Sequence, residues 1–213
     1  MSQNKLLQSL IEDPLVYYIY QRGSFIYGLN TKDSDKDYLV IIDPEYKLPA
    51  EYKEYQYKPQ FHKNDRNNIK YENCDFVFLY TTTWFDKVAK NDIQAWECAC
   101  LNKKFIKKEY VKLILKTDPI LLIKNIFKQS SILDNTYNYK HLWYFGKDIL
   151  FTQQILDFHK IVDFQEANNL YYRIYVQSNS SIAQNIVKET FQQFYEKNKG
   201  QYEQYIKSIK QNE

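Results

Sequence analysis

Two aspartates spaced two residues apart, Asp35 and Asp37, stand directly before an apolar run at 39–42 that predicts a buried strand. In an extended chain, side chains two residues apart point to the same face, so these carboxylates would converge. Like charges at such a distance repel each other unless a cation lies between them. Mg²⁺ binds carboxylate oxygens together with substrate phosphates, so the pair suits that ion.

A glycine-serine pair, Gly23-Ser24, precedes the two aspartates, and Gly28 follows it closely. The whole chain has only four glycines, and glycine allows backbone conformations and close approaches that other residues forbid. Backbone N–H groups around Gly23 and Ser24, at a turn that enters a helix, would form an anion site. We therefore predict a phosphate-binding turn beside a metal pair. The alternative is a solvated loop in which Asp35 only caps a turn.

The stretch 22–38, RGSFIYGLNTKDSDKDY, resembles the signature of the DNA polymerase β-like nucleotidyltransferase superfamily, in the form found in its predicted nucleotidyltransferase branch of bacteria and phages. The resemblance implies an α+β fold with a small mixed sheet, and a transferase that uses two Mg²⁺ ions, which Mn²⁺ could replace. It places a third carboxylate on the strand after a variable segment. Asp75 fits that position, at the start of a predicted strand at 75–80. An exposed strand end is the alternative for Asp75, and Glu72 is the rival acid.

The resemblance also implies a role for each site residue. Asp35 and Asp37 would hold both metal ions, and Asp75 would complete the metal that binds the attacking hydroxyl and accept its proton. The reaction would move a nucleoside monophosphate from an NTP to a hydroxyl acceptor, an RNA end, a protein or a small molecule, and release pyrophosphate. The predicted nucleotide-binding residues are Gly23, Ser24, Arg22, Ser34 and Lys36, with Arg22 or Lys36 as counter-charges to phosphate.

Composition narrows the class of protein. The 213 residues include 17% aromatics and carry a net charge of +3, which favours a folded chain and neither demands nor excludes a nucleic-acid partner. The cysteines, Cys74, Cys98 and Cys100, lack zinc-site spacing and are expected to be free thiols in a reducing, cytoplasmic environment. We expect neither a signal peptide in Met1–Pro14 nor a membrane span, since no run of about 18 apolar residues occurs.

Hydrophobic periodicity divides the chain into a nucleotidyltransferase domain at 1–116 and a helical domain at 117–213. Three threonines, Thr81-Thr82-Thr83, are expected to cap a helix. The other predicted elements are helices at 4–12, 24–30, 91–101, 141–156 and 180–210, and strands at 15–20, 37–42 and 75–80.

Some segments have two interpretations. The Lys- and Tyr-rich stretch 43–73 could bind a nucleotide by charge and stacking, or its tyrosines could cover the sheet. Lysines every four residues at 104–116 would form one stripe on a helix, either along a phosphate backbone or facing solvent. Segment 140–147 resembles a helix of the same branch but lacks its arginine. The roles left open are those of Glu97, Lys140, His141 and Lys147, and the lysines of the stripe are Lys104, Lys108, Lys112 and Lys116.

Three functions compete at this point. An active nucleotidyltransferase leads, because the acidic set is complete. A nucleic-acid or protein-binding module of the same fold without turnover is the second. An antitoxin-type enzyme that modifies a protein partner is the third, and the helical C-terminal half argues mildly against it.

Overall fold

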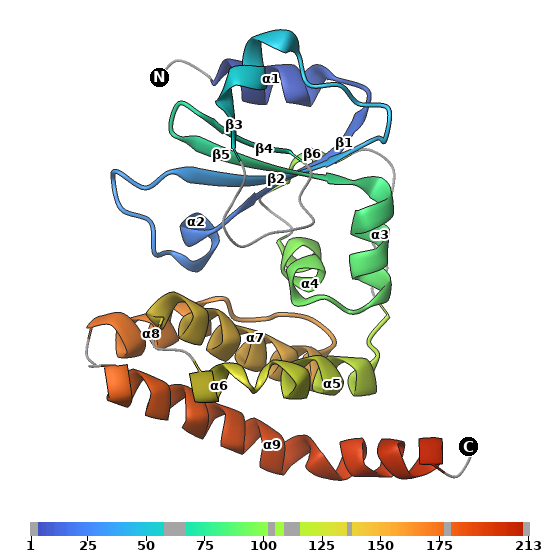
Figure 1. Cartoon of the computed structure of the whole chain (residues 1–213), viewed down its shortest axis with the longest axis vertical. Coiled ribbons are helices and arrows are strands. Elements are labelled where there is room, and N and C mark those ends of the chain that lie inside the picture. The colour runs from blue at the N-terminus through green and yellow to red at the C-terminus, as the bar shows by residue number, and fades with distance from the viewer. Residues whose placement is uncertain are drawn as a thin grey trace. The chain divides into compact units, whose positions relative to one another are not determined.

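The computed structural model describes residues 4–57, 67–101, 105–108, 116–135, 138–176 and 180–210, and Figure 1 shows their arrangement. The chain divides into two compact units, one of Met1–Ala89 with Glu97–Ile114, the other of Lys90–Trp96 with Leu115–Glu213. We call them the sheet unit and the helical unit. The domain boundary predicted between 116 and 117 stays a prediction.

Within the described residues, one sheet of six strands forms the sheet unit, in the order β3-β4-β5-β2-β1-β6. The central strands β2 and β5 are parallel, and every other neighbouring pair is antiparallel. The predicted α+β fold with a mixed sheet is therefore confirmed. The strands are β1 (Val16–Arg22), β2 (Lys36–Ile42), β3 (Gln56–Tyr57), β4 (Asn67–Tyr71), β5 (Cys74–Tyr80) and β6 (Phe105–Lys108).

Helix α1 (Lys5–Glu12) covers one face of the sheet, as Figure 1 shows. Asn4 caps it, since the Asn4 side chain accepts a hydrogen bond of 2.9 Å from the N–H of Leu7. The buried side chains of α1 are Leu6 and Leu10, and they belong to one core cluster with strand residues such as Val40. Burial of this apolar surface is what fixes α1 on the sheet.

The other face of the sheet packs against α3 (Thr81–Ala89) and carries the short helix α2 (Ser24–Tyr27) (Figure 1). Trp84 of α3 is fully buried, with its ring 5.5 Å from that of Tyr20. Tyr20 pairs with Leu39, so residues of β2 that alternate with Leu39 share this face. Asp37 is one of them, which places the predicted acidic pair on the α2 and α3 side.

The structure describes part of segment 43–73 and changes the expected start of one helix. Tyr46 and Tyr52 of segment 43–73 are buried in the core cluster, so these tyrosines cover the sheet. The segment also contains η1 (Ala50–Tyr55), β3 and β4. Helix α3 begins at Thr81, so the three threonines form its first turn instead of preceding it.

The helical prediction over 104–116 is wrong for residues 105–108, which form β6 and pair with β1. The edge of β1 that does not pair with β2 forms backbone hydrogen bonds with β6. This tertiary pairing overrides the helical spacing of the lysines. Lys104 and Lys112 lie outside the described residues. A continuous basic stripe of helical lysines is therefore excluded.

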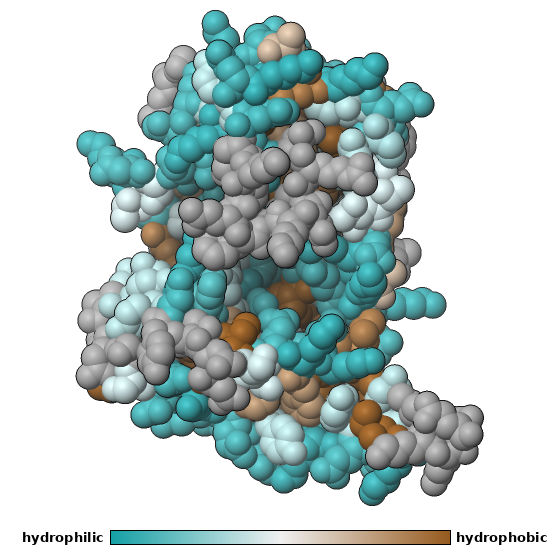
Figure 2. Space-filling model, viewed as in Figure 1, coloured by the Kyte–Doolittle hydropathy of each residue, from teal (hydrophilic) through white to brown (hydrophobic). Residues whose placement is uncertain are grey.

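The helical unit confirms the helices predicted after 117. Its central helix α7 packs against α5, α8 and α9. Figure 2 shows a mostly hydrophilic surface on the visible face, and none of the described helices is both long and apolar enough to cross a membrane. The helices are α4 (Ile93–Cys100, which spans both units), α5 (Pro119–Gln129), α6 (Ile132–Asn135), α7 (Tyr139–Phe158), α8 (Gln165–Tyr171), the π-helix η2 (Tyr172–Val176) and α9 (Ser180–Lys210).

Candidate active site

Four charged residues form one row across four neighbouring strands. Arg22 of β1 pairs with Asp37 of β2, and Asp37 pairs with Asp75 of β5. Asp75 in turn pairs with Lys70 of β4. Residues paired in register share a face of the sheet, so two carboxylates stand side by side with a cation on each flank. We call this set the charged row.

Asp35 lies two residues before Asp37 and joins the charged row through Lys70. The Asp35 carboxylate oxygen Oδ2 is 2.6 Å from Lys70 Nζ, and both side chains are well exposed, at 40% and 56%. Our sequence analysis did not predict Lys70 as a site residue. Lys70 could have been recognised from the two residues 72–73 that connect β4 to β5. A connection of this length suits a hairpin, and the hairpin would place Lys70 opposite Asp75.

Asp75 lies in a partly buried position. Burial raises the pKa of the Asp75 carboxyl above its ordinary 3.8; the Lys70 ammonium opposes the rise, the Asp35 carboxylate adds to it, and Arg22 opposes it. Its Oδ1 atom is buried and has no hydrogen-bond partner among the described residues. A buried carboxylate oxygen without a partner carries a desolvation cost, which a bound cation would offset.

Gly23 packs directly against the acidic pair. Its φ of +72° lies in a region that favours glycine, and a Cβ built there would stand 1.9 Å from Asp37 Oδ2. Helix α2 begins at the next residue, Ser24, and ends at Gly28, whose φ is +70° and whose N–H donates to the Ser24 carbonyl. The glycine requirement therefore follows from a close approach between this turn and a carboxylate.

A buried hydrogen bond holds α2 in place. The Tyr27 hydroxyl donates to Glu97 Oε2 across 2.7 Å, and Glu97 is only 6% exposed. Both residues belong to the sheet unit. Glu97, whose role the sequence left open, thus fixes the helix that follows the predicted phosphate-binding turn.

The remaining predicted residues have other positions or partners in the structure. Ser34 organises its own turn, accepting a 2.7 Å hydrogen bond from the N–H of Thr31. Lys36 pairs with Cys74 and therefore lies on the opposite face from Asp37. Glu72, the rival acid, accepts a hydrogen bond of 3.1 Å from Asn4 beside α1. Roles for Ser34 and Lys36 in nucleotide binding stay predictions.

The donor chemistry of the acids suits a hard divalent cation, because carboxylate oxygens are the ligands that Mg²⁺ and Mn²⁺ take. Asp37 and Asp75 stand together, and Asp75 Oδ1 has the unmatched oxygen described above. Across the described part of the chain, no three His, Cys, Asp or Glu side chains form a ready-made metal site. Asp35 is paired with Lys70 in this arrangement, so it would have to turn away from Lys70 to join the other two.

Lys140, His141 and Lys147 all lie on α7 of the helical unit. Lys147 is buried, at 5% exposure, with Nζ 3.1 Å from Asp148 Oδ1 and 5.4 Å from the centre of the Phe151 ring. Whether these residues take part in the reaction stays an open prediction. The three cysteines are free thiols, as expected.

A mixed sheet that sets adjacent carboxylates beside a glycine turn is the arrangement expected of a nucleotidyltransferase. The family model described as "Nucleotidyltransferase domain" matches residues 4–156, so the chain belongs to the nucleotidyltransferase domain family, a class of transferases of nucleotidyl groups. No curated protein matches the chain. One solved structure, a nucleotidyltransferase-like protein from Exiguobacterium sibiricum 255-15, is similar over 98% of this chain and 78% of its own, at 9% identity and a TM-score of 0.39. The family assignment rests on the family match alone.

Proposed function

We propose that this nucleotidyltransferase moves a nucleoside monophosphate from an NTP to a hydroxyl acceptor and depends on a divalent cation. The observation that carries the proposal is the pairing of Asp37 with Asp75 on adjacent parallel strands, with the Gly23 turn against Asp37. This brings two carboxylates from distant parts of the sequence to one place on the sheet. Family membership supports the reaction class.

Asp35, Asp37 and Asp75 would hold the cation, which is Mg²⁺ or Mn²⁺. When bound, the cation supplies positive charge that stabilises the phosphates during transfer. The Asp35–Lys70 pair is exposed, and such pairs contribute only about 0–1 kcal/mol, so exchanging Lys70 for a metal ion at Asp35 costs little.

The chain's own residues orient the reactants and take the proton. The acceptor oxygen forms a bond to the α-phosphorus of the NTP as the bond between that phosphorus and the bridging oxygen breaks, and pyrophosphate leaves. The Asp75 carboxylate accepts the hydroxyl proton, which suits its raised pKa. Backbone N–H groups at Gly23 and Ser24 bind the β- and γ-phosphates, and Arg22 supplies a counter-charge.

The test is a labelling experiment with each NTP. The full chain is incubated with Mg²⁺ and a triphosphate labelled at the α-phosphate, and products are separated by size. We expect Asp35→Asn to lower transfer by at least about 1,000-fold, because charge stabilisation by a metal ion is worth several kcal/mol.

Asp33→Asn is the matched control, since Asp33 is an exposed carboxylate in the same loop. It should transfer at the wild-type rate. Equal activity of Asp35→Asn and the wild type would disprove the metal-binding role. Label on RNA, on protein or on neither would identify the acceptor and separate the three functions considered from the sequence.

A further inference from the structure

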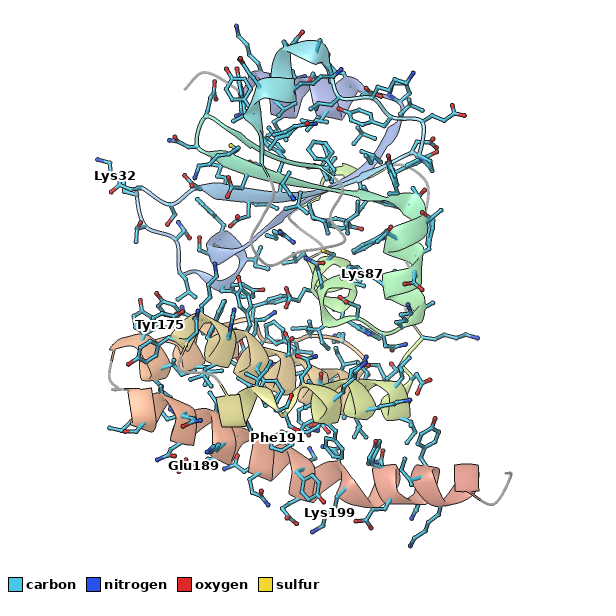
Figure 3. The ribbon with its side chains drawn as sticks, viewed as in Figure 1. Lys32, Lys87, Tyr175, Glu189, Phe191 and Lys199 are labelled. Carbon is cyan, nitrogen blue, oxygen red and sulfur yellow. The ribbon has the colours of Figure 1, made fainter. Side chains whose placement is uncertain are left out.

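Six aromatic side chains gather around α7 and η2 in the helical unit. Their rings form a continuous series of contacts with centroids 4.3–6.1 Å apart, and the Tyr171 and Tyr175 rings are stacked. Figure 3 labels Tyr175 beside the first turns of α7. The members of this tyrosine cluster are Tyr139, Trp143, Tyr144, Tyr171, Tyr172 and Tyr175.

One ring of the cluster is buried and two are exposed. Trp143 is 7% exposed and its indole N–H donates to the Ala167 carbonyl across 2.9 Å, which anchors this ring. Tyr144 and Tyr172 are 41% and 49% exposed, and Lys147 Nζ lies 5.7 Å from the centre of the Tyr144 ring. Part of each of these two side chains is therefore accessible to a ligand. Burial, with help from Tyr171 and Tyr144, raises the pKa of Tyr175 to about 12, so its hydroxyl stays neutral at physiological pH.

Two exposed cations come from the stretches that supply the rings. Residues 139–147 and 167–176 contain Lys140, Lys147 and Arg173, and the acids Asp148 and Glu166 lie immediately beyond them. Lys147 is paired with Asp148. Lys140 and Arg173 are both exposed. The same two stretches therefore carry exposed aromatic rings and two exposed cations.

The local backbone is also unusual. Residues Tyr172–Val176 form a π-helix, a rare conformation that often occurs at functional sites. It carries Tyr172, Arg173 and Tyr175 together. A regular continuation of α8 would turn these side chains differently, so the π-helix determines which of them join the cluster.

We propose that the tyrosine cluster binds a single-stranded nucleic acid, with bases stacked on Tyr144 and Tyr172 and phosphates bound by Lys140 and Arg173. Stacking on exposed rings combined with spaced cations is how proteins bind single strands. A single triphosphate at the same residues is the alternative occupant, and ATP is used below as the competitor that identifies it. The further assignment of the strand as the acceptor rests on the proposed function; the binding itself does not.

Fluorescence anisotropy of a labelled 20-nucleotide RNA of mixed sequence, titrated with the full chain, tests the binding. The Tyr144→Ser/Tyr172→Ser variant should bind at least about tenfold more weakly, because each stacked base contributes to affinity. Phe158→Ser removes a ring that is even more exposed, at 56%, at the far end of α7, and this variant should bind like the wild type. Melting curves of all variants show whether each is folded.

Salt dependence tests the charges separately. The Lys140→Gln/Arg173→Gln variant should lessen the slope of log affinity against log salt by about 1.4, since each lost phosphate contact on a single strand is worth about 0.7. Three results would overturn the inference: no strand binding by the wild type below about 100 μM, wild-type affinity in the folded tyrosine variant, or complete displacement of the strand by ATP.

The two proposals fail in different ways. Asp35→Asn should keep strand binding while it loses transfer. If binding depends on Tyr144 and Tyr172 but no NTP is transferred, the proposed function fails and the nucleic-acid site stands. If the wild type labels a protein or small molecule and binds no strand, the proposed function stands and the site is refuted.

Discussion

Asp35 and Asp75, the two acids that lie near Lys70, have different environments. Asp35 is exposed and paired, whereas Asp75 is confined between Lys70 and Asp37 with one oxygen unmatched. A charged carboxylate in such a position lowers the free energy of unfolding, because its desolvation is not fully compensated. Stability and activity should therefore respond in opposite directions when Asp75 loses its charge.

Asp75→Asn should melt at or above the wild-type temperature in EDTA at pH 7, by up to about 3 °C, although transfer is lost. The folded-state pKa of Asp75 is raised, so ionisation costs folding free energy as pH rises from the unfolded pKa through the folded one. At neutral pH that cost is fully present, and asparagine removes it. Differential scanning fluorimetry at pH 4 and pH 7 checks this, with the difference confined to the higher pH. A melting point several degrees below the wild type at pH 7 would show that the carboxylate is structural.

Gly23→Ala should destabilise the sheet unit by at least about 2 kcal/mol and abolish transfer. A left-handed φ costs an L-residue roughly 1–2 kcal/mol, and the new methyl group would also meet the Asp37 carboxylate. Gly200→Ala is the matched control, because nothing lies within 4 Å of its added Cβ, in the exposed part of α9. The free energy of unfolding of that variant should rise by about 0.5–1 kcal/mol, because alanine is more stable than glycine inside a helix. Equal urea midpoints for the two alanine variants would contradict the close approach.

Single residues also show what sequence reasoning can and cannot reach. Asp35, Asp37 and Gly23 could be predicted as site residues because their types and spacing indicate the chemistry within one short stretch. Lys70 was missed because its importance comes from a strand pairing, which depends on the hairpin before β5 and not on the lysine itself. Lys36 is as close in sequence to Asp37 as a residue can be, yet it lies on the opposite face.

At the level of elements, the predicted strands were those with apolar runs. β1, β2 and β5 bury side chains on both faces, so their sequences contain nearly continuous apolar runs that can be recognised as strands. β3, β4 and β6 are short and polar or rich in lysine, and they exist through backbone pairing with a neighbour. Such strands carry little hydrophobic signal, which is why 105–108 was predicted as helix.

Helix α2 is held on the sheet by packing and by the buried Tyr27–Glu97 hydrogen bond, and Tyr27→Phe tests the contribution of that bond. The change should cost about 1–3 kcal/mol by leaving the buried Glu97 carboxylate without the tyrosine proton. It should also raise KM for the NTP more than it lowers kcat, because α2 follows the turn proposed to bind phosphate. Denaturant melts and initial-rate kinetics measure the two effects.

Tyr17→Phe is the control for that experiment. It removes a similar hydrogen bond of 3.0 Å to Asp43, but at a solvent-accessible site. Water can replace the lost partner there, so stability and KM should stay close to those of the wild type. Identical behaviour of Tyr17→Phe and Tyr27→Phe would mean that the bond to Glu97 does not position α2.

At the level of the whole molecule, the two units interleave along the chain. Residues 90–96 belong with the helical unit although residues 97–114 belong with the sheet unit. Asn91 links this insertion to α5, since its Oδ1 accepts from the Asp118 N–H at 3.1 Å and from the Trp96 indole at 3.4 Å. Local hydrophobic periodicity cannot reveal this interleaving, because a helix has the same periodicity whichever unit it packs against.

A fragment of residues 90–213 should therefore melt cooperatively and at a higher temperature than a fragment of residues 117–213. The shorter piece lacks the Asn91 hydrogen bonds and the buried Trp96 side chain, whose loss costs about 3–5 kcal/mol by analogy with core truncations. Circular dichroism at 222 nm during heating compares them. Indistinguishable melting curves would place the boundary at 116 and 117, as first predicted.

The strands that carry Asp37 and Asp75 lie in the middle of the sheet, each bonded to a neighbour on both sides. Their amide protons can exchange with deuterium only when the surrounding ladder opens, whereas the outer strands β3 and β6 can fray alone. The distance between the two carboxylates should consequently stay constant when the edge strands β3 and β6 open. Any conformational change that accommodates different substrates must then come from the turn and the side chains around the carboxylates, because the central strands stay in place.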